Sequence, residues 1–219
     1  MELTPEELRV LGCLVEKQLT TPQQYPLTLN ALVLACNQSS NRDPVSSYDE
    51  RTVEDAVTSA KARGLARFVH PSHGRSALRY RHDLDSALGL DVRPLALLAV
   101  LMLRGAQTPG ELRARTERMA EFADLAEVEA ELGALAARQE PLVVRMARQP
   151  GQKEDRYAHC LGEAGTAIAT TVVPERAEPT RHIDAGRGTP DLAAEVTRLR
   201  AELDELRRDL DELRTQLGA

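Results

Sequence analysis

Apolar side chains between residues 49 and 81 follow first a helical period and then a strand period. Val53, Val57 and Ala60 recur at spacings of four and three, which predicts a helix with one apolar stripe. Asp49 is suited to cap its start, and Gly64 can adopt the left-handed conformation that ends it. Two runs of alternating polarity, 65–70 and 77–81, then flank a turn-rich loop. The stretch therefore predicts a helix that leads directly into a β-hairpin.

The predicted hairpin separates apolar from basic side chains. Because neighbouring residues of a strand point to opposite faces, Phe68, Leu78 and Tyr80 share one face. Arginines occupy the other face and the loop, and two further basic residues lie near the end of the preceding helix. These basic residues are Lys61, Arg63, Arg67, Arg75, Arg79 and Arg81. The sequence has no acidic residue between positions 56 and 82, so the segment forms a local basic patch.

A second copy of the pattern lies between residues 124 and 159. Asp124 and Glu127 have the spacing of a capping box, and Val128, Leu132 and Leu135 are expected to face inward from the helix that follows. The runs 142–147 and 155–160 then flank another turn-rich loop, which predicts a second hairpin. The basic residues of this hairpin are Arg145, Arg148, Lys153 and Arg156.

Two further helices are predicted before each of these units. In the first half, Thr4 opens one helix through a capping box, and Thr28 caps a second that extends to residue 37. In the second half, after a break at 89–94, residues 95–104 form a helix that is apolar nearly all round. Thr108 then opens a short helix through another capping box.

Three helices and a hairpin, in that order, are the elements of a winged helix-turn-helix. We therefore predict a mainly α protein with small β-hairpins, an α+β fold, with one winged-helix domain at residues 1–83 and a second at 84–161. The length of 219 residues suits two small domains. Aromatic residues make up only 3% of the chain, with no Trp, which favours small helical cores built from Leu, Val and Ala.

The last part of the chain carries the most regular pattern. Several Gly and Pro residues without a sustained period predict a flexible linker at 162–190. From 191 to 219, leucines and one valine alternate spacings of four and three, a heptad repeat that predicts a coiled-coil helix. In a parallel pair of helices, the acidic residues at heptad position g of one helix face the basic residues at position e of the other. An antiparallel pair would set acid against acid and base against base. We therefore expect parallel self-association, most simply a homodimer, although leucine at nearly every core position leaves a trimer open.

The sequence also bears on where the protein works. Cys13, Cys36 and Cys160 are an odd number and widely spaced, which fits reduced thiols inside a cell. The most apolar run, 95–103, is far shorter than the ~20 residues that a membrane span needs, and the N-terminus lacks a secretory leader. We therefore expect a soluble, cytoplasmic protein without a membrane partner. The net charge of −6 counts against nucleic acid, but the basic patch is local.

Four long segments of this chain carry a resemblance. They are LGCLVEKQLTTPQQYPLTLN (11–30), ACNQSSNRDPV (35–45), LRGAQTPGELR (103–113) and VVRMARQPGQKEDRYAH (143–159). Together they resemble the bacterial YceH family, over both predicted domains and into the coiled coil. The resemblance implies a tandem winged-helix protein whose biochemical role is not established, and it transfers no catalytic or ligand-binding residue.

Two functions fit these predictions. In the first, the two hairpins, which are the wings of this fold, bind double-stranded DNA through phosphate contacts from the basic residues named above. The acidic third helices oppose it, because side chains such as Glu50, Glu54 and Glu127 would face a polyanion. In the second, the winged helices form a protein-interaction scaffold with no nucleic-acid binding. The DNA hypothesis requires the hairpin arginines to be free of carboxylates from the same chain.

Other chemistry finds less support. No arrangement of nucleophile, base and orienting group is evident, so the chain is predicted not to be an enzyme. His70, His73 and Cys160 could be imagined as metal ligands but are better explained as polar residues of the wings, and no metal or other cofactor is predicted. The polar segments 37–45 and 104–113 are interpreted as turns and capping hydrogen bonds, with a ligand role for the second as the less favoured alternative.

Overall fold

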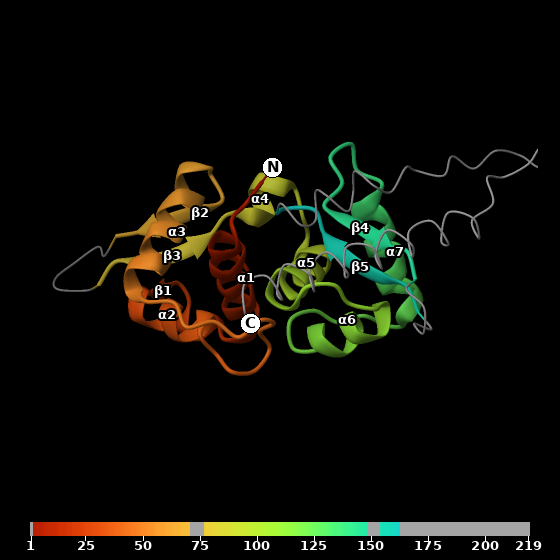
Figure 1. Cartoon of the computed structure of the whole chain (residues 1–219), viewed down its shortest axis with the longest axis horizontal. Helices are drawn as coiled ribbons and strands as arrows, with labels where there is room; N and C mark the ends of the chain where they lie inside the picture. Colours follow the sequence, from red (N-terminus) through yellow and green to blue (C-terminus); the bar gives the residue numbers. More distant parts are fainter. Residues whose placement is uncertain (1, 71–76, 149–153, 163–219) are drawn as a thin grey trace, which may run out of the picture. The chain divides into compact units, whose positions relative to one another are not determined.

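The structure is a computed structural model that describes residues 2–70, 77–148 and 154–162 (Figure 1). These residues form seven α-helices, one short 3-10 helix and five strands. The strands build one three-stranded and one two-stranded antiparallel sheet. The predicted α+β class is therefore confirmed. All described residues belong to one compact unit of the chain.

Three α-helices precede the first hairpin. They are α1 (Pro5–Thr20), α2 (Leu29–Cys36) and α3 (Glu50–Ala62), and the 3-10 helix η1 (Pro22–Gln24) follows α1. Thr4 and Glu7 form the predicted capping box of α1. The side chains of Thr28 and Asp49 accept hydrogen bonds from backbone N–H groups in the first turns of α2 and α3. Gly64 has a φ of 74°, the left-handed conformation predicted after α3.

The first hairpin consists of β2 (Ala66–Val69) and β3 (Arg79–His82). Their register sets Phe68 opposite Tyr80, and the two rings meet edge to face with centroids 5.0 Å apart. The predicted apolar face of the hairpin is thus present. A third strand, β1 (Leu27–Thr28), pairs with the other edge of β3. This strand was not predicted, because two residues are too few to show a period.

The second half contains α4 (Leu84–Leu88), α5 (Val92–Arg104), α6 (Pro109–Thr116), α7 (Leu125–Ala136), β4 (Val143–Met146) and β5 (Arg156–His159). Its details differ from the prediction in three places, the first of which is α4, where no helix was predicted. The expected break at 89–94 is shorter, since α5 begins at Val92 and holds Pro94 in its first turn, where proline is tolerated. The capping box of α7 is incomplete, because Glu127 accepts a hydrogen bond from the N–H of Ala123 rather than that of Asp124.

The two halves share one hydrophobic core. A single cluster of buried side chains runs through both, and α1 lies beside α5 within it (Figure 1). Every residue of α5 from Pro94 to Leu103 is buried, as its sequence predicted. Gly12 permits a close approach, because a Cβ atom there would lie 2.8 Å from Cγ of Leu103. The boundary predicted between residues 83 and 84 is not tested by these contacts and stays a prediction.

The beginning and the end of the described fold are joined. The N–H group of Leu3 donates to the carbonyl of Leu161 at 2.7 Å, and Leu3 forms a parallel bridge with Gly162. Beyond Gly162, the predicted linker 162–190 and coiled coil 191–219 lie outside the described residues, as do Arg75 and Lys153. None of the helices described is both long and apolar enough to cross a membrane.

Candidate functional site

The basic side chains of the first hairpin contact an acidic side chain of the same chain. Nε of Arg67 lies 2.8 Å, and Nε of Arg81 lies 3.9 Å, from the carboxylate of Asp83, the residue that follows β3. The Arg67 side chain is 61% exposed, whereas that of Asp83 is only 14% exposed. One carboxylate therefore offsets part of the charge of two arginines.

The second hairpin repeats this arrangement just before β5. Nε of Arg148 lies 2.7 Å from the carboxylate of Asp155, and Nε of Arg145 lies 2.8 Å from it. These hydrogen bonds, that from Arg148 first, hold the pKa of Asp155 below its usual range. Arg156 lies 2.9 Å from Glu111 in the first turn of α6. All three described arginines of this hairpin thus contact carboxylates.

The remaining predicted contact residues divide into two kinds. Arg63 lies 3.1 Å from the buried carboxylate of Glu7 in α1. The ammonium group of Lys61 lies 4.3 Å from the ring centroid of Phe68, and Arg79 donates a 2.7 Å hydrogen bond to a backbone carbonyl. Within the described ranges, Lys61 and Arg79 are the predicted contact residues that meet no carboxylate.

The third helices of both halves carry exposed acidic side chains. Glu50, Glu54 and Asp55 are exposed at the N-terminal end of α3, with Arg51 beside them. Glu129 is exposed near the start of α7. A helix-turn-helix protein turns this part of its third helix towards the bases of DNA. The arrangement would therefore bring carboxylates close to phosphates.

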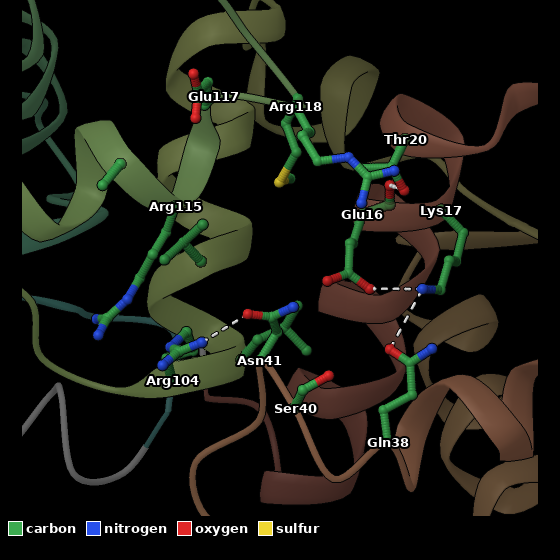
Figure 2. A pocket seen from close by; sticks show the side chains of 14 residues that line it. Glu16, Lys17, Thr20, Gln38, Ser40, Asn41, Arg104, Arg115, Glu117 and Arg118 are labelled. Carbon is green, nitrogen blue, oxygen red and sulfur yellow. Dashed lines mark hydrogen bonds and ion pairs between the residues drawn. The ribbon is translucent and has the colours of Figure 1, made fainter.

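A different polar site lies where the two halves meet. A cavity of about 430 Å³ is enclosed by α1, the loop 38–41, α5, α6 and the residues that follow α6 (Figure 2). Thr20, Gln38, Ser40 and Asn41 contribute uncharged polar groups. The charged side chains that line it are Glu16, Lys17, Arg104, Arg115, Glu117 and Arg118. This cavity was not predicted from the sequence.

Buried Arg42 organises one side of the cavity. Its guanidinium donates to both oxygens of Glu16, at 2.6 and 3.1 Å, and to the carbonyl of Ala35 at 3.0 Å. Burial opposes ionisation of Glu16, but these hydrogen bonds and the charge of Arg42 lower its pKa below the usual value. Lys17 also contacts Glu16, at 3.1 Å. The Glu16 carboxylate is therefore already shared by two cations.

Arg104 lies at the other side, at the end of α5. It donates a 2.8 Å hydrogen bond to the side chain of Asn41, whose backbone has a left-handed φ of 59°. Burial and the neighbouring charge of Arg115 lower the pKa of Arg104. Arg104 and Arg115 also line a second polar cavity together with Arg156. Arg156, which was predicted to lie on the surface of the second hairpin, thus belongs to the cationic region between the halves.

Comparison with known proteins identifies the family. Residues 3–152 match the model of the family described as "Protein of unknown function, DUF480". The chain belongs to the DUF480 family. A UPF0502 protein of Geobacter metallireducens is 55% identical over 161 residues, 74% of this chain and 73% of the relative. The UPF0502 protein YceH of Salmonella paratyphi B is 46% identical over 181 residues, 80% and 84% of the two chains. The resemblance to the YceH family is confirmed.

Three of the four segments on which that resemblance depends meet at the cavity. Segments 11–30, 35–45 and 103–113 of this DUF480 protein all supply lining residues. Sequence reasoning assigned 37–45 and 104–113 to turns and capping hydrogen bonds, which explains polar residues such as Asn41 and Thr108. It did not explain the arginines at positions 42 and 104, and these two residues were the signal in the sequence that could have indicated the cavity. Among the described residues, no three His, Cys, Asp or Glu side chains are grouped so as to hold a metal ion.

Proposed function

We propose that this DUF480 protein is a non-enzymatic pair of tandem winged-helix domains that acts as a protein-interaction scaffold. The repeated order of elements supports the domain assignment: α1, α2, α3 and the β2–β3 hairpin are followed by α5, α6, α7 and the β4–β5 hairpin. A smaller feature also repeats. Leu27 of β1 pairs with Tyr80 of the first hairpin, and Gln107 forms a bridge with Tyr157 of the second.

The preference for a protein partner depends on one observation, the contact of the hairpin arginines with carboxylates of their own chain. Asp83 and Asp155 each contact two arginines, so each group retains a single net positive charge. DNA affinity grows with the number of cations that neutralise phosphates and release counterions. An exposed ion pair is worth only ~0–1 kcal/mol, so an arginine could leave its carboxylate and bind a DNA phosphate instead. The lost ion pair would reduce the free energy gained from DNA, and the carboxylate would remain beside the phosphates.

The chemistry of α3 indicates what kind of protein surface would suit. Glu50, Glu54 and Asp55 give its exposed N-terminal half an acidic character. A partner with basic side chains would be attracted there, and the attraction would weaken with salt. Reversal of Glu54 to lysine should therefore release such a partner. Crosslinking of the full chain to partners in cell extract, followed by mass spectrometry of wild type and E54K, would measure this loss.

DNA binding is retained as a second candidate because Lys61 and Arg79 meet no carboxylate within the described part of the chain. Lys61 lies at the end of α3 and Arg79 at the start of β3. Two such cations would favour contacts to the phosphate backbone over readout of bases. Double-stranded DNA would then be held mainly by the first wing.

Fluorescence anisotropy with a labelled random duplex separates the two candidates. Binding should be measured at about 50 and 200 mM salt, a range over which each phosphate contact lowers the affinity by roughly 3–4-fold. The scaffold proposal predicts no salt-sensitive binding. Tight binding at low salt that is lost in R79E, and kept in the control R138E on the other half, would refute it in favour of DNA.

We also propose that the chain self-associates through residues 191–219. Support comes from the heptad pattern, in which Glu195 would face Arg200 of a parallel partner helix and Glu202 would face Arg207. An antiparallel pair would set acid against acid and base against base. A homodimer would present two copies of each acidic α3 surface and so raise the avidity for a partner that carries two sites.

A further inference from the structure

The cavity between the halves has more positive charge than its own carboxylates can balance. Lys17, Arg104, Arg115 and Arg118 face two carboxylates, those of Glu16 and Glu117, and Arg42 supports Glu16 from within the protein. The whole chain has a formal net charge of −6. A concentration of cations in one concave site of an acidic protein therefore calls for a specific explanation.

The cations are only partly satisfied by the chain. The Arg118 guanidinium has no ion pair or hydrogen bond among the residues described. Arg104 donates to the neutral amide oxygen of Asn41, and Arg115 lies 3.8 Å from Glu111. In Figure 2, Arg118 extends from the residues after α6 towards the side of the cavity formed by α1. Side-chain donors from both halves thus line one cavity, in which the Arg118 guanidinium has no acceptor among the residues described.

The carboxylates do not remove this excess. Glu16 is held by Arg42 at 2.6 Å and by Lys17 at 3.1 Å, so its charge is already matched. Glu117 and Arg118 are both exposed, so solvent weakens both charges and the two largely offset each other. The remaining excess comes from Arg104 and Arg115, which are half-buried. The guanidinium group of an arginine binds a carboxylate or phosphate group through two parallel hydrogen bonds, and Lys17 supplies a further positive charge.

We propose that this cavity binds a small organic anion bearing phosphate or carboxylate groups. The volume of about 430 Å³ falls within the range of ~300–1,000 Å³ that small-molecule sites occupy, so the cavity has room for an anion with more than one phosphate or carboxylate group. Arg118 and Arg104 bind its anionic groups, and Thr20, Ser40 and Gln38 offer hydrogen bonds to its neutral part. Because the donors come from both halves of the chain, the bound ligand joins the two halves. The inference is independent of whether the partner of the hairpins is protein or DNA.

Isothermal titration of the full chain with pyrophosphate and with citrate, at matched ionic strength, tests the site. R118A removes a charge-assisted donor that has no structural partner, so the free protein should keep the wild-type melting temperature while the dissociation constant rises roughly 10–100-fold. The control is R51A, which removes an arginine that is 90% exposed on α3. Its dissociation constant should equal that of wild type.

The pattern of results decides the matter. Binding of either probe that is weakened in R118A and unchanged in R51A supports the site, and the stronger probe shows whether phosphate or carboxylate is preferred. Absence of binding of both probes to the wild-type chain overturns the proposal. Equal affinities of wild type and R118A also overturn it, because the anion would then be held elsewhere. Should R118A lose stability, R118K is a second variant for which the dissociation constant should also rise. Lysine keeps the positive charge of Arg118 but cannot donate two parallel hydrogen bonds.

Discussion

The contact between α1 and α5 makes one quantitative prediction, for the substitution of Gly12 by alanine. In a helix interior, glycine to alanine normally stabilises a protein by roughly 0.5–1 kcal/mol. At Gly12 the new Cβ would lie 2.8 Å from Cγ and 2.9 Å from Cδ2 of Leu103. Carbon atoms normally approach to about 3.5–4.0 Å, so the contact is repulsive. Leu103 is 2% exposed, so its side chain is packed against neighbours on most sides, and a shift away from Gly12 would have to be towards the cavity that it lines.

The two effects can be set against each other. Overpacking of a close-packed core costs roughly 1–3 kcal/mol, which exceeds the gain in helix propensity. We therefore expect G12A to lower the free energy of unfolding by about 1 kcal/mol. Gly133 on α7 provides the matched control, because a Cβ there meets no atom within 4 Å. G133A should raise the free energy of unfolding by about 0.5–1 kcal/mol.

Urea unfolding followed by far-ultraviolet circular dichroism measures both variants, and the lack of tryptophan makes this signal preferable to fluorescence. The decisive quantity is the difference between G12A and G133A, expected to be about 2 kcal/mol. If both variants were stabilised equally, α1 and α5 would not approach each other as closely as the structure has them. The shared core of the two halves would then have to be rejected.

Three further predictions follow from other features. His82 is fully buried, and burial lowers its pKa from 6.5 to about 4, so the unfolded chain takes up the proton first. Its contribution to stability should be complete above about pH 6.5 and fall by about 2 kcal/mol at pH 5, and His159, whose pKa burial also lowers to about 4, should add a similar loss. Urea unfolding at both pH values should therefore show a smaller loss in H82N than in wild type. D155N should free Arg145 and Arg148 and strengthen binding of random duplex at low salt relative to wild type; unchanged anisotropy would mean that this carboxylate does not mask the basic surface. Sedimentation should show a dimer for the full chain and a monomer after removal of residues 191–219, and a monomeric full chain would contradict the coiled coil.

Local signals in the sequence were sufficient for most of the secondary structure. Capping residues such as Thr4 and Thr108 mark helix starts because they bond to backbone groups only three residues away. The pairing of Phe68 with Tyr80 follows from the period of two in each strand and the length of the loop between them. Short elements were missed, since α4 and β1 are too brief to show a period and depend on tertiary contacts.

The partners of charged side chains could not be predicted in the same way. The sequence shows that Arg67 and Arg81 are basic and on one face, but Asp83 reaches both only because the chain continues past β3 at a particular angle. The cavity between the halves is a stronger case. Glu16 and Arg42 are far apart in the sequence, and so are Asn41 and Arg104, which meet only when α1 packs on α5. Such contacts depend on the packing of helices, which a single sequence does not specify.

The link between Leu3 and Leu161 sets a limit on how the protein can be shortened. The family match ends at residue 152, before β5 begins. A chain cut there would lose the strand that pairs with β4 and would leave the N–H of Leu3 without its acceptor. The open edge of β4 would then be available to strands of other molecules. Expression trials should therefore retain at least residue 162, and an affinity tag at the N-terminus will emerge beside the point where the described fold ends.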